Sequence, residues 1–351
     1  MTTTAFTDRR TVLQTITAAV AGGSMLGGSA AGAARADRGR GRESVVTVTA
    51  QHDHDAEEHR FELDTHTVPA GWTTVTFDNP TEHAHFVYSS KIPEQVIEDS
   101  KAEGMALREF WIETVTKPFQ YFMDKTYVPG KEPDPADNTD IYNSLFPPWF
   151  GDITYYGGPG LTSGGRSSEA TVDLPPGEYI LECYVKNGAN DFHSYLGMLD
   201  LLTVTDDESA AKEPDATLKV TVDNDGLTAP TSTRPGQHTV AVRFDEQQAY
   251  SNLVGHDVHL VRLDGDTTAG DVAGWMDWTS PSQLIADGDE PGPFIGGVQD
   301  IWTGDLPRTG YADVLLKPGE YAWVAEVPAS DKKGLLAEFS VPGKKDKGGD
   351  D

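Results

Sequence analysis

The segment LPPGEY at residues 174–179 returns near the end of the chain as LKPGEY at residues 316–321. A predicted histidine-containing strand precedes each copy, HAHFV at residues 83–87 and HDVHLV at residues 256–261. The recurrence of the same motifs in the same order indicates an internal duplication. The sequence therefore predicts two related domains in tandem.

Segments of alternating apolar and polar residues surround the repeated motifs. They lie at residues 45–49, 73–77, 170–174, 179–183 and 201–205. A period of two bounded by turns is typical of half-buried antiparallel strands, and 36 Gly and 22 Pro supply frequent turns. The fold class that follows is all-β, with each domain a β-sandwich.

The domain boundaries follow from composition. We expect a first domain over residues 45–206 and a second over residues 215–342, joined by an acidic linker at residues 207–214. Residues 37–44 form a polar linker before the first domain. Residues 343–351 form a charged tail, and neither segment has the apolar content to bury a core.

Residues 94–165 of the first domain break the strand pattern. Between Glu94 and Met123 apolar residues recur every three or four positions, which predicts one or two amphipathic helices. Residues 134–165, rich in Pro, Gly and aromatic side chains, are expected to form an ordered loop. The simplest interpretation is an insertion that covers an open end of the sheet.

Residues 1–36 have the features of an export signal. Arg9 and Arg10 precede Leu13 and a weakly apolar run, a pattern that resembles a twin-arginine signal for the export of folded proteins. We expect the protein to be extracellular or on the cell surface. An uncleaved signal would tether it to the membrane, since the apolar run is nearly long enough to span a bilayer.

The charge balance excludes some partners. With 56 acidic residues against 27 Lys and Arg, the formal net charge is -29, which repels nucleic acid and anionic lipid. Such acidity resembles the proteins of salt-loving archaea. Most Asp and Glu side chains are therefore interpreted as solvated surface.

The single cysteine is the starting point for chemistry, because an unpaired thiol in an exported protein is open to oxidation unless it is buried or binds something. Cys183 ends a predicted strand, and His193 and Met198 follow it. His85 lies upstream, six residues after Asn79. A thiolate, two imidazoles and a thioether form the donor set of a blue-copper centre.

Other histidines compete for this role. His83 and His85 point to the same face if both lie in one strand, so His83 is a possible alternative ligand. A further cluster is formed by His52, His54, His59 and His66. It is interpreted as an exposed polar edge, with weak capture of Cu(II) as the alternative.

These motifs resemble the cupredoxin family of plastocyanin-like and azurin-like proteins at about residues 68–92 and 170–205. The resemblance implies Greek-key β-sandwiches and one type 1 copper, with His85, Cys183 and His193 as trigonal ligands and Met198 as the axial ligand. The loop between Cys183 and His193 is longer than in those proteins and closer to that of two-domain copper nitrite reductases.

The second domain lacks this donor set. Aligned on the repeated PGEY, Ala325, Ser330 and Leu335 stand at the places of the thiol, the second histidine and the methionine. His256 and His259 are then interpreted as polar or packing residues, with binding of a labile ion as the alternative. This domain is expected to support, orient or dock the first.

One-electron transfer to a redox partner protein, without a small-molecule substrate, is the leading hypothesis for function. A copper enzyme of the nitrite reductase or multicopper oxidase kind is a weaker one, because Cys183 is flanked by Glu182 and Tyr184 where those enzymes place a histidine. A metal-free binding or structural module is the third hypothesis.

Overall fold

The computed structural model describes residues 44–53, 58–129, 131, 135–250, 255–285 and 290–343. The predicted export signal, nearly all of the linker at residues 37–44, and the tail beyond residue 343 lie outside the described residues. Within the described ranges, no helix combines the length and apolarity needed to cross a membrane.

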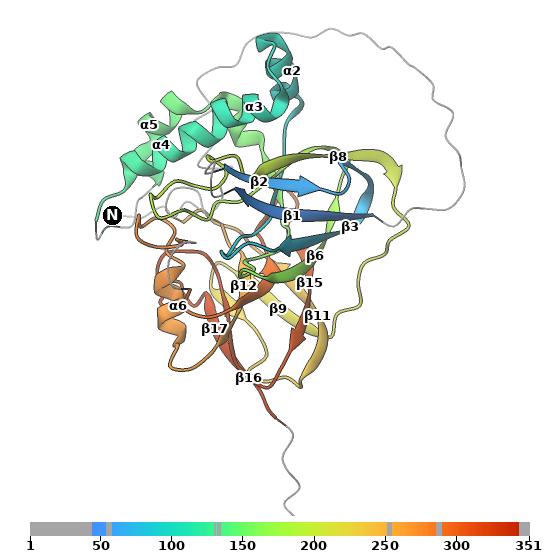
Figure 1. The fold of residues 1–351 in the computed structure, drawn as a ribbon, viewed down its shortest axis with the longest axis vertical. Coiled ribbons are helices and arrows are strands. Elements are labelled where there is room, and N and C mark those ends of the chain that lie inside the picture. The colour runs from blue at the N-terminus through green and yellow to red at the C-terminus, as the bar shows by residue number, and fades with distance from the viewer. Residues whose placement is uncertain are drawn as a thin grey trace, which may run out of the picture.

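The first half of the chain is a β-structure interrupted by helices (Figure 1). Its strands are β1 (Val45–Asp53), β2 (Glu58–Leu63), β3 (Thr67–Asn79), β4 (Tyr88–Lys91), β5 (Thr154–Tyr156), β6 (Arg166–Leu174), β7 (Gly177–Glu182) and β8 (Leu199–Glu208). Its helices are α2 (Glu94–Glu103), α3 (Leu107–Trp111), the π-helix η1 (Ile112–Thr116), α4 (Lys117–Thr126), η2 (Pro135–Asn138), α5 (Thr139–Leu145) and η3 (Pro148–Asp152).

The second half carries nine more strands and one helix among the described residues. They are β9 (Leu218–Asp223), β10 (Gly226–Thr228), β11 (Gly236–Phe244), β12 (Val258–Leu263), α6 (Ala269–Trp275), β13 (Phe294–Val298), β14 (Ile301–Trp302), β15 (Arg308–Leu316), β16 (Gly319–Val324) and β17 (Leu336–Val341). All five alternating segments of the sequence lie in or overlap strands. The all-β fold class with a helical insertion is confirmed.

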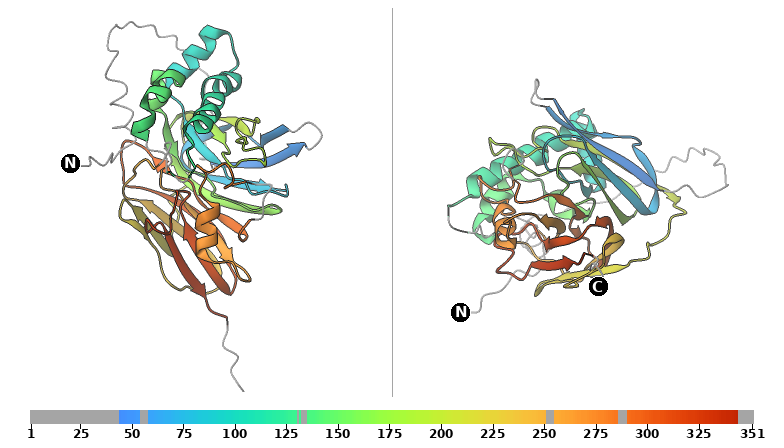
Figure 2. Two further views of the ribbon diagram at one scale, coloured as in Figure 1. Left: turned by 90° about the vertical axis from the view of Figure 1, so that its left-hand side faces the viewer. Right: turned by 60° about the horizontal axis from the view of Figure 1, so that its bottom comes forward.

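The two halves share one sheet. Strands run in the order β10-β9-β11-β15-β6-β3-β8-β7-β4-β5-β14, while β13-β12-β16-β17 form a separate four-stranded sheet. The halves are joined where β15 pairs antiparallel with β6, for example Tyr311 opposite Thr171. The tandem halves are therefore packed edge to edge through backbone hydrogen bonds (Figure 2).

The repeated PGEY motif forms the same turn twice. Gly177 and Gly319 have φ of +150° and +155°, a region that side chains with a Cβ rarely adopt. The tyrosine hydroxyls that follow donate to backbone carbonyls four residues upstream, Tyr179 to Pro175 at 2.7 Å and Tyr321 to Lys317 at 2.9 Å. The repeat is thus a structural device that starts β7 and β16.

The insertion forms a helical cover over one end of the first half (Figure 1). Trp111 and Phe122 are buried in it, consistent with the predicted amphipathic helices. The loop expected at residues 134–165 is partly wrong, because η2, α5, η3 and β5 lie within it. Three of its aromatic residues, Tyr142, Phe146 and Phe150, pack on one another and make the segment more regular than its Pro and Gly content suggests.

The strand expected at residues 83–87 is also wrong. His85 makes only an isolated bridge to Thr162 there. The Asn79 amide donates to the carbonyls of His83 and Thr162, at 2.7 and 2.8 Å, and so replaces ladder hydrogen bonds by side-chain ones. The chain beside the candidate site is consequently an irregular, tightly held segment.

Candidate metal centre

Three donor atoms from distant parts of the sequence meet at the end of β7. Cys183 Sγ lies 3.8 Å from His85 Nδ1 and 3.9 Å from His193 Nδ1, and the two Nδ1 atoms are 3.0 Å apart. All three side chains are fully buried. Among the described residues, this is one of two groups of side chains placed closely enough to hold a metal ion.

The spacing of these atoms fits one ion. Bonds typical of a first-row ion such as zinc, about 2.0 Å to nitrogen and about 2.3 Å to sulfur at roughly 120°, place nitrogen about 3.7 Å from sulfur and the two nitrogens about 3.5 Å apart. The two observed nitrogen–sulfur distances agree closely, and the Nδ1–Nδ1 distance is somewhat shorter. A small rotation of either ring would complete a trigonal site.

Backbone hydrogen bonds shape the segment from Cys183 to Met198, which carries three of the predicted ligands and is called the ligand loop. The Cys183 N–H donates to the Met198 carbonyl at 3.2 Å, and the Met198 N–H donates to the His193 carbonyl at 2.7 Å. The Ser194 N–H donates to the Cys183 carbonyl at 2.8 Å. The loop therefore turns back on itself and brings the imidazole of His193 over the thiol.

Met198 is buried and bonded through its backbone to Cys183 and His193. This places the residue beside the three converging donors. Its axial role stays a prediction.

The position of His85 is fixed from the neighbouring segment. Its N–H donates to the Thr162 carbonyl at 3.2 Å, and the Thr162 N–H returns a bond to the His85 carbonyl at 2.8 Å. His83, the alternative ligand, is half-buried, and its ring contacts that of His52, with the centroids 5.8 Å apart. The structure brings His85, and not His83, to the sulfur.

Burial dominates the electrostatics of the three donors. It raises the pKa of the Cys183 thiol to about 12, although backbone hydrogen bonds from Phe86 and Val185 favour the thiolate. Burial and the neighbouring imidazoles lower the pKa of His85 and of His193 well below the ordinary value. The rings are thus neutral, as metal ligands must be, and binding of a cation would have to displace the thiol proton.

The Nε2 atoms of His85 and His193 are buried without a hydrogen-bond partner in the described part of the chain. When both Nδ1 atoms bind an ion, these nitrogens would carry the ring protons. A buried unpaired N–H costs free energy, which a metal bond at Nδ1 would help to offset.

The helical cover holds the ligand loop. Arg108 of α3 donates to the Gly197 carbonyl at 2.7 Å, next to Met198. Gln120 of α4 donates to the Asn190 carbonyl at 3.0 Å and accepts from the Phe192 N–H at 2.8 Å, next to His193. The insertion therefore fixes the long loop that separates Cys183 from His193.

Glu182 joins the cover to the sheet. Its carboxylate accepts from Trp111 Nε1 at 3.1 Å, Tyr184 OH at 2.7 Å and Ser90 Oγ at 3.2 Å. Burial raises the pKa of Glu182 to about 7, and the three hydrogen bonds counteract that rise. The residues flanking the cysteine thus serve packing and anchoring, and neither is a histidine.

The second half is also hydrogen-bonded to the ligand loop. The Lys186 N–H donates to the Leu284 carbonyl at 3.1 Å, and its buried Nζ donates to the carbonyls of Trp278 at 2.9 Å and Ser280 at 2.5 Å. Burial lowers the pKa of Lys186 to about 8. The second half therefore contacts the ligand loop directly, and its expected role in supporting or docking the first domain stays a prediction.

The equivalent end of the second half repeats the backbone without the donors. The Ala325 N–H donates to the Leu335 carbonyl at 2.9 Å, and the Leu335 N–H donates to the Ser330 carbonyl at 2.8 Å. These bonds match those of Cys183, Met198 and His193. The alignment of Ala325, Leu335 and Ser330 with those residues therefore holds in three dimensions.

A second close group is formed by Asp257, His259 and Glu326. The sequence did not predict this group, since it indicated a polar or packing role for His259, with a labile ion as the alternative. The signal in the sequence was limited to the positions of the two acids, Asp257 in the HDVHLV segment and Glu326 shortly after the second PGEY. His259 Nε2 lies 3.0 Å from Asp257 Oδ2 and 3.7 Å from Glu326 Oε2. Its Nδ1 accepts the Leu161 N–H at 2.9 Å.

That hydrogen bond decides the protonation of His259. The two acids raise its pKa, but a proton on Nδ1 would face the Leu161 N–H, so the geometry favours a neutral ring with its proton on Nε2. A ligand histidine instead presents a bare nitrogen to the metal and donates through the other. The group is therefore better suited to a buried hydrogen-bond network than to an ion.

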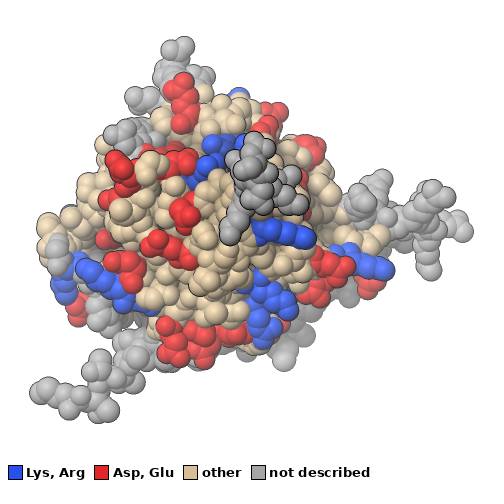
Figure 3. Space-filling view, turned by 90° about the horizontal axis from the view of Figure 1, so that it is seen from below, with Lys and Arg blue, Asp and Glu red and all other residues tan. Residues whose placement is uncertain are grey.

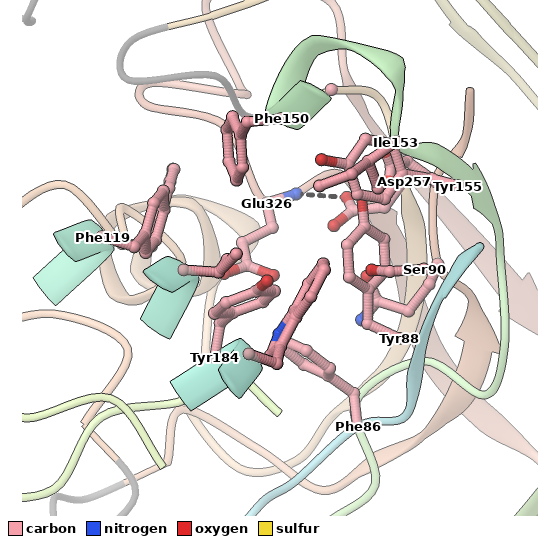
Figure 4. A pocket seen from close by; sticks show the side chains of 16 residues that line it. Phe86, Tyr88, Ser90, Phe119, Phe150, Ile153, Tyr155, Tyr184, Asp257 and Glu326 are labelled. Atoms are coloured by element: carbon pink, nitrogen blue, oxygen red, sulfur yellow. Dashed lines mark hydrogen bonds between the residues drawn. The ribbon is translucent and has the colours of Figure 1, made fainter. Parts of the chain in front are cut away.

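A cavity of about 60 Å³ lies where the two halves meet (Figure 4). Aromatic rings, including Phe86, Phe119 and Tyr184, line it together with the carboxylates of Asp257 and Glu326. It has room for a few water molecules at roughly 10–15 Å³ each. Tyr184 connects this wall directly to Cys183 along the chain.

The N-terminal histidines divide into two places. His66 is exposed, and its ring bonds the Leu201 carbonyl at 3.2 Å. His54 lies outside the described residues. His52 and His59 stack on each other, and His59 stacks on the ring of His193. The interpretation of the cluster as an exposed edge is therefore wrong for His59, which is buried.

No protein-family model and no curated protein matches this chain. Among solved structures, it is similar to an auracyanin B, with 19% identity over 38% of this chain and 94% of that one, at a TM-score of 0.26. Auracyanin A, a "blue" copper protein from Chloroflexus aurantiacus, gives 15% identity over 35% and 95%, at 0.24. A blue copper oxidase from Nitrosomonas europaea gives 12% over 85% of each chain, at 0.21. Likenesses this distant carry no argument, so the identity of the centre rests on its donor atoms.

Proposed function

We propose that the protein is a type 1 copper protein that transfers single electrons. The observation that carries this proposal is the convergence of one thiol and two Nδ1 atoms in a fully buried position. Soft sulfur suits Cu(I), and imidazole suits both oxidation states. His85, Cys183 and His193 would hold the ion, with Met198 as the axial ligand.

The surroundings support a redox role. The ligand loop is fixed by α3, α4 and the second half, so the donors keep their places when the charge of the ion changes. Full burial of the donors favours the lower charge of Cu(I) and thus a higher reduction potential. The copper, when bound, supplies the one-electron chemistry, and the chain supplies rigidity and the exclusion of water.

The proposed setting is outside the cell, reached through the twin-arginine route, with a redox protein as partner. Acidic side chains, with Lys and Arg between them, are spread over the face seen in Figure 3. The net charge of -29 favours a basic partner at low ionic strength. Concentrated salt would screen that attraction to a few ångströms.

Titration of the purified protein with Cu(II) tests the proposal. We expect one equivalent to produce an intense visible sulfur-to-copper charge-transfer band, and Cys183→Ala to abolish it. His66→Ala is the matched control and should leave the band unchanged, because this exposed ring lies away from the sulfur. Colourless or non-stoichiometric binding would favour a metal-free module, and turnover of nitrite or phenols would favour an enzyme.

A further inference from the structure

We propose that His59 and His52 form the electronic contact between the copper centre and the surface of the protein. This inference rests on the proposed function. It assigns a role to two histidines outside the ligand set, on a hairpin more than a hundred residues away from His193 in the sequence.

The three rings form a column. His59 stacks on His193 with ring centroids 4.3 Å apart and planes inclined by 15°. His52 in turn stacks on His59, with ring centroids 4.2 Å apart and planes inclined by 18°. The column starts at a ligand, passes through a buried ring and ends at His52, which is half-buried.

Strand pairing puts these rings in place. His52 and His59 are directly opposite each other in the β1–β2 hairpin. They continue the row of inward-facing side chains formed by Val48, Ala50 and Phe61, all buried. The inner face of the hairpin thus changes from apolar residues to imidazoles at the point where it extends over the ligand loop.

The column offers an approach to the buried donors through rings that contact one another. His193 is itself fully buried, so a partner cannot touch the ligand ring directly. Arg108 and Gln120 close the loop from the helical side, and Lys186 closes it from the second half. Electron tunnelling weakens steeply with distance and with gaps between atoms, which favours a path of rings in van der Waals contact.

The parallel arrangement argues for stacking rather than for a second metal site. Two imidazoles that share an ion direct their in-plane lone pairs at one point. Rings that lie face to face at 4.2 Å direct their lone pairs along parallel lines. The geometry of His52 and His59 is therefore that of an electronic contact and a shield over His193.

Electron transfer between two copies of the protein needs no other oxidant or reductant. In self-exchange, Cu(I) in one copy loses one electron and becomes Cu(II), while Cu(II) in a second copy gains it and becomes Cu(I). No proton and no bond is transferred. Because the reaction has no net driving force, a change in reduction potential alone does not change its direction or extent.

The experiment measures the self-exchange rate of the copper-loaded protein by NMR line broadening in mixtures of the Cu(I) and Cu(II) forms. We expect His59→Leu and His52→Leu to slow self-exchange severalfold while the visible band remains. His59→Phe, which keeps a flat ring at the same place, should retain a rate close to that of wild type. His66→Leu is the matched control, since it removes an exposed histidine outside the column.

The outcomes separate the two proposals. A wild-type protein without a thiolate-to-copper band would overturn the proposed function, and this inference with it. An intact band with unchanged self-exchange in both leucine variants would overturn the inference alone. Equal slowing by His59→Leu and His59→Phe would also overturn it, because it would show that only the shape of the cover matters.

Discussion

The ends of β7 and β16 share one backbone design and differ in chemistry. Both strands start at the same Pro-Gly turn with a tyrosine hydroxyl bonded four residues upstream. Both are followed by a loop closed by equivalent backbone hydrogen bonds. One loop carries Cys183, His193 and Met198, and the other carries Ala325, Ser330 and Leu335.

The difference separates the backbone of the loop from the side chains that it carries. The second half closes its loop with small and apolar side chains in the same places, so this backbone arrangement forms without a thiol, a second histidine or a methionine. The loops also differ in their supports. The ligand loop is held by the helical cover and by the second half, whereas the loop after Ala325 is bonded within the second half, to Asp257 and Leu227.

The largest predicted effect comes from an attempt to transplant the donors. We expect the triple variant Ala325→Cys, Ser330→His, Leu335→Met, made in a Cys183→Ala background, to show no visible charge-transfer band. His256 would have to be its fourth donor, but its Nδ1 bonds the Glu246 carbonyl at 3.1 Å and its Nε2 bonds Tyr250 OH at 2.9 Å. Absorption spectroscopy with Cu(II) is the measurement. A band as intense as that of wild type would show that the donor set alone is sufficient.

The second prediction compares the polar anchors of the two ends. Asn79 bonds the His83 carbonyl, and Gln247 bonds the His256 carbonyl and N–H at 2.8 and 2.6 Å. Each is buried, so replacement by leucine leaves orphaned backbone groups and should cost about 2–4 kcal/mol of stability. Denaturant unfolding would measure this cost.

The two variants should differ in their copper binding. Asn79→Leu is expected to weaken the visible band, since it releases the segment that carries His85, whereas Gln247→Leu should leave the band unchanged. An equal loss of the band in both variants would contradict the assignment of Asn79 as a local anchor of the site.

A third prediction concerns the helical cover. Gln120→Ala removes two hydrogen bonds to the ligand loop and should destabilise the protein by about 1–2 kcal/mol. Gln95→Ala is the matched control, because Gln95 is exposed on α2 and bonds only Asp99 there. Thermal unfolding of the two variants would check the difference. If both changes had the same small effect, the cover would not hold the loop.

The last predicted effect is on the pH dependence of stability. Burial raises the pKa of Glu326 to about 7 in the folded protein. A raised carboxyl pKa means that the folded state holds its proton more tightly, so this group's stabilising contribution is complete below about pH 4.5 and is lost as the pH rises to about 7. Glu326→Gln should remove that loss and be relatively more stable, by about 2 kcal/mol, at pH 8 than at pH 4.5.

Urea unfolding of wild type and variant at the two pH values measures this difference. The opposite result, a variant relatively less stable at pH 8, would indicate a charged pair between His259 and Glu326. It would contradict the neutral tautomer deduced from the Leu161 hydrogen bond.

Sequence reasoning succeeded where the pattern was local or repeated. The alternation of apolar and polar residues predicted the principal strands. The PGEY repeat identified Ala325 as the residue of the second half equivalent to Cys183. The spacing of soft donors selected the three residues whose donor atoms meet in the structure. Their role as ligands remains a prediction.

The features that were missed depend on contacts between distant segments. Nothing near His59 in the sequence indicates that its ring stacks on His193, since the contact requires the β1–β2 hairpin to extend over the ligand loop. Likewise, the hydrogen bonds of the Asn79 side chain turned an expected strand into an irregular segment. The burial of Lys186 against the second half depends on how the halves pack, which local sequence does not encode.

X-ray absorption at the copper edge of the loaded protein tests the central claim most directly. We predict one sulfur at a short, thiolate-like distance together with two imidazole nitrogens, and loss of the sulfur in Cys183→Ser. A shell of nitrogen and oxygen alone, identical in wild type and in Cys183→Ser, would contradict the account.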